Sequence, residues 1–348
     1  MKMLQPQQAG IWELAQHLYK SRQGWRHPIY LIHAMTAKCN ARCGFCAWNP
    51  EFYQGHDELS TEEVKTLYRD ARRAGFMALS MWGGEPLLRR DFSELAQFAK
   101  AQGFLTHIVT NGFLLEKKLD EVAPHLDRIC ISVDHPSEKH DQLRGTKGLY
   151  GKILSATLRL KSRYPSTKIV YNYTIQKANA DPETLEEMAR LMKQLGVVGI
   201  FNGLRVDAAM PDGQEVDLAA YNPSDEALTQ AFRKVEELKR RGFPIVNSYT
   251  HIRKMIHAPM RYRCHWPKFM LPIEANGDVV DCMHWGTRPI ASLRDISLAE
   301  VLEHPRLQAL AGPAGEACHQ CVSLHRVEIS EAWEGRVEPL VSWARALA

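Results

Sequence analysis

The sequence predicts an α/β protein in which parallel strands are connected by helices. Two observations carry this prediction. Short apolar runs typical of strands recur along residues 29–206, and segments typical of helices lie between them. Strands that alternate with helices in this way pair in parallel through right-handed crossovers. The chain has 348 residues, of which 45% are hydrophobic, so it can bury one large core or two ordinary ones.

The alternating part of the chain divides into strands and helices with clear bounds. The predicted strands are Ile29–Met35, Phe76–Trp82, Phe104–Thr110, Arg128–Asp134, Lys168–Ile175 and Val197–Val206. The predicted helices are Ser60–Ala74, Phe92–Ala101, Leu114–Val122, Tyr150–Arg163, Pro182–Leu195 and Pro223–Arg241. The first helix begins with Ser60 and has Glu63 three residues later, which is the pattern of a capping box.

The residues after 245 follow a different pattern. The run FMLPIEANGDVVDC alternates around Asn276-Gly277 and predicts a hairpin with a type I′ turn. Ser297–Ala311 is predicted to be one helix, and a further helix ends the chain. We therefore expect an N-terminal capping segment, an α/β domain and a small α+β domain, which comprise residues 1–28, 29–245 and 246–348.

Composition excludes several classes of partner. No apolar run approaches the roughly 18 residues that a membrane span needs, and the start of the chain lacks the pattern of a secretory signal. We therefore expect a cytoplasmic protein. The 44 basic and 40 acidic residues give a net charge of +4 without a dense basic block, so we expect no nucleic-acid partner.

The eight cysteines fall into three groups. Cys39, Cys43 and Cys46 form a C-x3-C-x2-C group, Cys130 stands alone, and the last quarter of the chain contains Cys264, Cys282, Cys318 and Cys321. In a reducing compartment, clustered thiols indicate metal or iron-sulfur ligands rather than disulfides. Four thiolates can close a metal site, whereas three leave a position open for a ligand that is not protein.

The first group lies in a segment with a specific resemblance. TAKCNARCGFCAWNP resembles the cluster loop of radical S-adenosylmethionine (SAM) enzymes, with Phe45 at the aromatic position of their pattern. Three more elements follow at separations similar to those of the family. They are Gly83-Gly84-Glu85-Pro86, Thr110-Asn111-Gly112, and a run that contains Ser132, Asp134, His140, Asp141, Arg144 and Gly145.

The resemblance implies a fold, cofactors and roles. It implies a partial (β/α)6 TIM-like barrel, in which ligands gather at the carboxyl ends of the strands. Three cysteines would hold a [4Fe–4S] cluster whose open iron binds SAM, and an external reductant of the flavodoxin or ferredoxin type would supply one electron. The cluster splits SAM into a 5′-deoxyadenosyl radical. The implied SAM contacts are Phe45, Gly83, Gly84, Glu85, Ser132, Asp134, Arg144 and Asn172, with Glu85 accepting from the ammonium group and Arg144 pairing with the carboxylate.

The tail resembles the Twitch domain, the short form of the SPASM domain. In that form, Cys264, Cys282, Cys318 and Cys321 would hold one auxiliary [4Fe–4S] cluster. A structural zinc site closed by the same four cysteines has the same spacing and stays open as an alternative. His265, His284 and His319 neighbour these cysteines and are expected to lie around the metal or on the surface rather than to bind the metal.

Cys130 has two interpretations. Strand alternation places it on the same face as Ser132 and Asp134, so its thiol could return a hydrogen atom to a substrate radical. The commoner role for such a residue is that of a small buried hydrophobe. Oxidation of an alcohol carbon would also require a base. His107, Arg205 and Asp207 lie on or directly after predicted inward-facing strands, and each could equally make a structural ion pair or a surface contact.

Three functions compete. The leading hypothesis is a radical SAM enzyme that abstracts hydrogen from an unactivated carbon of a small metabolite such as a sugar, an aminocyclitol or a lipid precursor. The auxiliary cluster would then assist net oxidation, epimerisation or bond formation. The second hypothesis is a maturase that cross-links or epimerises a ribosomally made peptide, which we disfavour because only 38 residues precede Cys39. The third is a non-catalytic iron-sulfur or zinc scaffold.

Overall fold

The computed structural model describes residues 28–46, 57–204, 218–257, 262–280, 289–312 and 322–347. Within these ranges, one nine-stranded sheet has the order β6-β5-β4-β3-β2-β1-β7-β8-β9. Its first six strands along the chain are β1 (Tyr30–Thr36), β2 (Ala78–Gly83), β3 (Leu105–Thr110), β4 (Arg128–Ser132), β5 (Lys168–Ile175) and β6 (Val198–Gly203). Each pairs in parallel with the next, which confirms the prediction from the alternating pattern.

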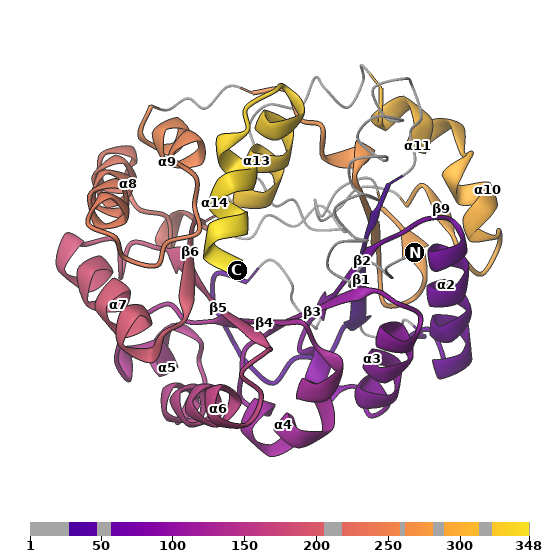
Figure 1. Cartoon of the computed structure of the whole chain (residues 1–348), viewed down its shortest axis with the longest axis horizontal. Helices are drawn as coiled ribbons and strands as arrows, with labels where there is room; N and C mark the ends of the chain where they lie inside the picture. The colour runs from indigo at the N-terminus through magenta and orange to yellow at the C-terminus, as the bar shows by residue number, and fades with distance from the viewer. Residues whose placement is uncertain are drawn as a thin grey trace, which may run out of the picture.

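The helices of the alternating part cover the outer side of the sheet. Figure 1 shows the six parallel strands as an arc with α2, α3, α4, α6 and α7 around it. Their bounds are α2 (Thr61–Arg73), α3 (Phe92–Ala101), α4 (Leu115–Val122), α6 (Leu149–Arg163) and α7 (Pro182–Leu195), and α8 (Asp225–Arg240) follows β6. This arrangement is the partial barrel that the resemblance implied.

Local signals explain several of these bounds. The Ser60 hydroxyl accepts from the backbone N–H of Glu63, whose carboxylate accepts from the N–H of Ser60, so the predicted capping box is confirmed. The α7 helix begins with a side-chain cap from Asp181 and Pro182 in its first turn. It ends at Gly196, whose φ of +61° suits glycine.

Two predictions for the tail were wrong in detail. Ser297–Ala311 forms two helices, α10 (Leu298–Leu302) and α11 (Pro305–Leu310), because Pro305 cannot continue the first helix and starts the second. The predicted hairpin is present as β7 (Met270–Ile273) and β8 (Asp278–Val279), but its turn is not of type I′. Of the residues in this turn, only Gly277 has a positive φ, +95°, and its N–H donates to the carbonyl of Glu274, so a type I turn is followed by a left-handed glycine.

The hairpin of the tail extends the sheet of the barrel. Strand β7 pairs in parallel with β1, with Tyr30 opposite Met270, and β8 and β9 (Ala291–Ser292) continue antiparallel. The domain boundary near residue 245 stays a prediction, but the sheet does not end there. The tail therefore lies directly beside the strand that leads into the cysteine loop.

The concave side of the arc is occupied by the end of the chain. In Figure 1, α13 (Leu324–Trp333) and α14 (Glu338–Leu347) face the inner side of the strands, next to α9 (Tyr249–Ile256). Leu324 and Trp343 pack there against Cys130 and Val170 of the strands. None of the helices in the described part of the chain combines the length and apolar character that a membrane span requires.

Candidate functional site

The predicted site residues gather at the carboxyl ends of neighbouring strands. The cysteine loop follows β1, Glu85 follows β2, Asn111 follows β3 and Asp134 follows β4. Parallel strands bring these ends to one edge of the sheet. The predicted capping segment lies, apart from Pro28, outside the described residues, and so do Arg205 and Asp207.

Two glycines at the end of β2, Gly83 and Gly84, hold the start of the cysteine loop. The N–H of Gly84 donates to the carbonyl of Thr36 at 2.9 Å, and the N–H of Glu85 donates to the carbonyl of Lys38 at 2.7 Å. A Cβ at Gly84 would lie 2.2 Å from the Lys38 oxygen, and one at Gly83 would lie 2.5 Å from the Thr36 oxygen. Only glycine permits this approach, so these positions bring backbone against backbone immediately before Cys39.

Glu85 is completely buried and bonded within the chain. Its carboxylate accepts from the Thr110 hydroxyl at 2.7 Å, the Asn111 N–H at 2.7 Å and the Leu87 N–H at 3.1 Å. Burial raises the pKa of Glu85 to about 7, although these hydrogen bonds oppose the shift. Glu85 therefore joins the turn after β2 to the end of β3, and its contact with the SAM ammonium group stays a prediction.

Polar groups approach the sulfur of Cys39. The N–H of Ala41 donates to it at 3.4 Å, and the side-chain amide of Asn111 lies 3.9 Å from it. The same amide donates to the Asn40 side chain at 2.8 Å. Burial raises the pKa of the Cys39 thiol, and the Ala41 N–H acts in the opposite direction. Asn111 thereby connects the end of β3 to the cysteine loop.

A buried ion pair supports the middle of the loop. Arg144 donates from Nε to Asp134 at 2.6 Å, and its Nη1 lies 3.9 Å from the sulfur of Cys43. The Asp134 side chain is fully buried and also accepts from the Thr174 N–H at 2.9 Å. Burial raises the pKa of the Cys43 thiol, whereas Arg144 lowers it. The structure therefore pairs two predicted SAM contacts with each other, and those SAM contacts stay predictions.

Aromatic packing covers the same part of the loop. The Phe45 ring lies under the Arg144 guanidinium, whose carbon is 5.1 Å from the ring centroid, and meets Tyr221 edge to face at 6.3 Å. A Cβ at Gly44 would lie 2.0 Å from the Tyr221 hydroxyl oxygen, and one at Gly145 would lie 2.6 Å from the Arg42 carbonyl. The loop thus packs tightly against the residues that follow β4 and those that precede α8.

The other site residues predicted in the barrel lie in different surroundings. Ser132 is the last residue of β4 and is buried, and the Asn172 amide oxygen accepts from Asn202 at 2.7 Å. Cys130 is buried in the apolar cluster with Val170, which raises the pKa of its thiol to about 12. These surroundings suit a small buried hydrophobe, and the role of hydrogen donor stays a prediction. His107 hydrogen bonds to the Tyr30 hydroxyl at 3.1 Å.

The tail site is described only in part. Cys264 is buried with Ile32 and Trp266 in an apolar cluster at the inner side of β1. Cys282, Cys318 and Cys321 lie outside the described residues, as do His284 and His319. Trp82 packs against both this cluster and the one that contains Phe45, so one side chain joins the surroundings of Cys264 to those of the cysteine loop.

The donors of the loop fit an iron-sulfur cluster. Cys39 and Cys43 carry free thiols, and thiolates are the usual ligands of such clusters. The N–H groups near both sulfurs stabilise the charge of a thiolate. In the described part of the chain, no group of three or more His, Cys, Asp or Glu side chains could hold a metal ion. In a [4Fe–4S] cube, each thiolate binds a different iron, so the ligands do not share one ion.

Sequence profiles agree with these features. Residues 34–192 match the profile of the radical SAM superfamily, and residues 264–322 match that of an iron-sulfur cluster-binding domain, the SPASM domain. Together the two matches indicate a radical SAM domain followed by an iron-sulfur cluster-binding domain, and domains of these kinds correspond to [4Fe–4S] clusters and SAM as cofactors. These matches do not distinguish the Twitch form of the domain from the full SPASM form.

Individual proteins show similarity of two kinds. The chain is 35% identical over 223 residues to the Fe-coproporphyrin III synthase of Methanosarcina barkeri. The aligned region covers 63% of this chain and 54% of the relative. The chain thus spans about half the length of that relative. The structure of Streptococcus suis SuiB bound to its precursor peptide SuiA has a TM-score of 0.66 at 16% identity, covering 88% of this chain and 72% of SuiB. anSMEcpe with bound AdoMet has a TM-score of 0.64 at 15% identity, covering 81% and 82%. These two likenesses concern the fold alone.

Sequence reasoning missed two residues near the loop. Glu58 and Arg89 both contact the end of β1, yet neither belongs to a motif with a recognisable spacing. Their one signal in the sequence is their position, because Glu58 precedes the capping box and Arg89 follows the Gly83–Pro86 element. Their contacts join segments that are far apart in the sequence.

Gly84→Ala tests the backbone contact before Cys39. The added methyl group would lie 2.2 Å from a backbone oxygen, so the start of the loop must move. We expect the anaerobically reconstituted variant to lose the iron held by the loop, about four atoms per chain, as measured by iron and sulfide analysis. Gly151→Ala is the matched control, because its Cβ would meet nothing within 4 Å inside α6. An iron content equal in both variants would contradict the assigned role of Gly84.

Asp134→Asn tests the buried ion pair. The substitution leaves Arg144 without its carboxylate in a buried site, which costs about 3 to 5 kcal/mol. We expect the free energy of unfolding to fall by that order, as measured by chemical denaturation of the metal-free protein. Asp70→Asn breaks an exposed pair with Arg73 and should cost no more than about 1 kcal/mol. Similar losses in the two variants would show that the buried pair contributes little.

Proposed function

We propose that this protein is a cytoplasmic radical SAM enzyme that abstracts hydrogen from an unactivated carbon of a small organic substrate. The observation that carries the proposal is the loop of Cys39, Cys43 and Cys46, which is held at the carboxyl ends of β1 to β4 by contacts from each following turn. The match of residues 34–192 to the radical SAM superfamily supports the same function.

The chain supplies the binding and orientation. Cys39, Cys43 and Cys46 would hold one [4Fe–4S] cluster and leave an iron open to SAM. Once reduced by a donor of the flavodoxin or ferredoxin type, this group supplies homolytic cleavage of the sulfonium and thereby hydrogen abstraction. Asn111 and Arg144 orient the thiolates from two sides, and Phe45 with Tyr221 excludes water from the loop.

For the substrate, we favour an iron porphyrin or one of its precursors. The support is the 35% identity with a synthase of Fe-coproporphyrin III, a similarity that spans 223 residues. The likeness to peptide-bound SuiB comes at 16% identity and gives no separate support for a peptide substrate. Porphyrins therefore come before sugars, aminocyclitols and lipid precursors as substrates to test, and a modified peptide is the outcome that would redirect the proposal.

For the tail, we propose the Twitch form with one auxiliary [4Fe–4S] cluster. Its ligands would be Cys264, Cys282, Cys318 and Cys321, which account for every cysteine outside the loop except Cys130. The match of residues 264–322 to an iron-sulfur cluster-binding domain supports iron over the alternative of structural zinc.

Cys43→Ala and Cys130→Ala separate the parts of this proposal. The reconstituted wild-type protein should bind about eight iron atoms per chain and cleave SAM when reduced. Cys43→Ala should lose about four of these atoms and all cleavage, whereas Cys130→Ala should keep both. Cleavage of SAM by Cys43→Ala would contradict the proposed cluster of the cysteine loop. Zinc without iron in the tail would contradict the proposed auxiliary cluster.

Deuterated substrates test the substrate class. Incubation of the reduced enzyme with deuterated porphyrins should move deuterium into 5′-deoxyadenosine, as measured by mass spectrometry. Transfer from a peptide and from no porphyrin would replace the proposed substrate. Loss of product with retained SAM cleavage in Cys130→Ala would identify Cys130 as a hydrogen donor, and unchanged product formation would identify it as a packing residue.

A further inference from the structure

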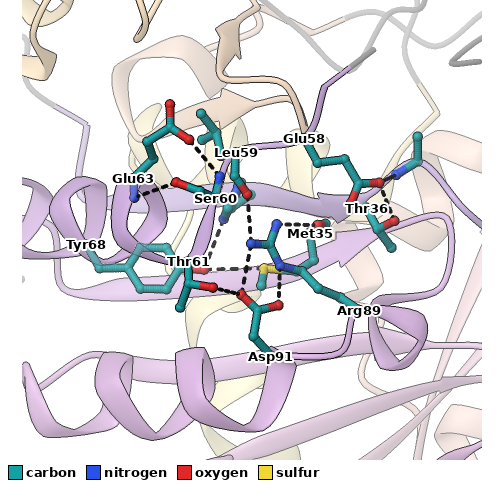
Figure 2. A network of polar contacts seen from close by, with 12 residues as sticks. Met35, Thr36, Glu58, Leu59, Ser60, Thr61, Glu63, Tyr68, Arg89 and Asp91 are labelled. Carbon is teal, nitrogen blue, oxygen red and sulfur yellow. Dashed lines mark hydrogen bonds and ion pairs between the residues drawn. The ribbon is translucent and has the colours of Figure 1, made fainter. Parts of the chain in front are cut away.

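The cysteine loop has a base at which its two ends meet. The loop extends from Ala37, directly after β1, to Asp57, and residues 47–56 within it lie outside the described ranges. Figure 2 shows the polar contacts at the base. The Glu58 carboxylate accepts from the Thr36 hydroxyl at 2.5 Å and from the Ala37 N–H at 3.0 Å. The residue after the loop thus binds the residues before it.

The same contact extends toward the first ligand. The Thr36 hydroxyl oxygen accepts from the N–H of Lys38 at 3.1 Å. The carboxylate of Glu58 therefore fixes Thr36 and Ala37 directly and Lys38 through one hydroxyl. The backbone of residues 83–85 holds the carbonyls of Thr36 and Lys38, as described above. Cys39 follows a segment that is bonded from both sides.

A buried guanidinium joins the two ends a second time. Arg89 is 8% exposed and donates from Nη1 to the Met35 carbonyl at 3.0 Å and from Nη2 to the Leu59 carbonyl at 2.8 Å. Its charge is balanced by Asp91, to which Nε donates at 2.7 Å, and Asp91 in turn accepts from the Thr61 hydroxyl at 2.7 Å. Figure 2 shows Arg89 between the end of β1 and the start of α2.

The base of the loop is also tied to the hairpin of the tail. The N–H of Leu59 donates to the Ala275 carbonyl at 2.7 Å, and a Cβ at Gly277 would lie 2.9 Å from the Leu59 side chain. Arg294 donates to the carbonyls of Asp57 and Glu58 at 3.2 and 3.3 Å. Residues 57–59 therefore contact both the barrel and the tail.

We propose that Glu58 and Arg89 are positioning residues that close the base of the cysteine loop and hold Cys39 and Cys43 in place before any metal binds. Closing a loop removes part of its conformational entropy, so ligands on a closed loop lose less freedom when a cluster assembles. Glu58 acts through Thr36 and Ala37, and Arg89 acts through the carbonyls of Met35 and Leu59. This inference concerns the metal-free chain and does not depend on the proposed substrate.

Thiol reactivity of the metal-free, full-length protein tests this role. In Glu58→Ala, we expect Cys39 and Cys43 to be alkylated by iodoacetamide about tenfold faster than in the wild type, as measured by mass spectrometry. A hydrogen bond to a charged group contributes about 1.4 kcal/mol or more, which corresponds to that factor. Cys130, which is buried in another cluster, should keep its rate and serves as the internal reference.

Matched variants separate positioning from general stability. Glu58→Gln keeps an oxygen that can accept from Thr36 and Ala37 and should restore most of the wild-type protection. Thr36→Val removes one donor and should raise the rates in the same direction, with no further increase when combined with Glu58→Ala. Glu62→Ala is the control, because Glu62 is exposed on α2 and pairs with Lys65 outside the network. It should leave the rates unchanged.

The reconstituted protein gives a second readout. In Glu58→Ala, the loop cluster should release its iron to a chelator faster than the wild type, and the KM for SAM should rise more than kcat falls. Unchanged alkylation rates in both Glu58→Ala and Thr36→Val would overturn the proposal. Faster alkylation of Cys130 to the same degree as Cys39 would also overturn it, because Glu58 would then support the whole fold. Failure of porphyrin turnover would leave these results unaffected.

Discussion

The site depends on a contact between two backbones at the carboxyl ends of β1 and β2. Residues 83–85 donate two hydrogen bonds to the carbonyls of Thr36 and Lys38, and the approach is too close for any side chain at Gly83 or Gly84. Because these bonds come from the backbone, their geometry is set by the parallel pairing of β1 with β2. The sheet itself thus determines where the cysteine loop begins.

The other strands then act on successive parts of the loop. The end of β3 contacts Cys39 through Asn111, and the Asp134–Arg144 pair after β4 reaches Cys43. Burial raises the pKa of both thiols, so metal-free cysteines in this setting favour the neutral form. Binding of iron requires their deprotonation, and the nearby N–H and guanidinium groups reduce its cost. A loop without such groups would hold the same cysteines but stabilise their thiolates less.

Sequence patterns predicted the parallel strands and the site elements but not the contacts that join them. The capping box at Ser60 and the alternation of strands and helices depend on near neighbours, and both are confirmed. The predicted type I′ turn was wrong because an Asn-Gly pair also fits a type I turn followed by a left-handed glycine, and here Ala275 and Asn276 are the central residues and Gly277 follows them. The pairing of β7 with β1 and the contact of Glu58 with Thr36 join residues far apart in the chain, for which a single sequence has no periodic signal.

The central claim is that three cysteines at this edge of the sheet hold a cluster with one iron open to SAM. Electron paramagnetic resonance of the reduced, anaerobic protein tests it most directly, with the tail cysteines replaced by alanine so that only the loop can hold a cluster. We expect a [4Fe–4S] signal whose g values change when SAM is added. A signal that does not respond to SAM, or no signal from the loop, would contradict it.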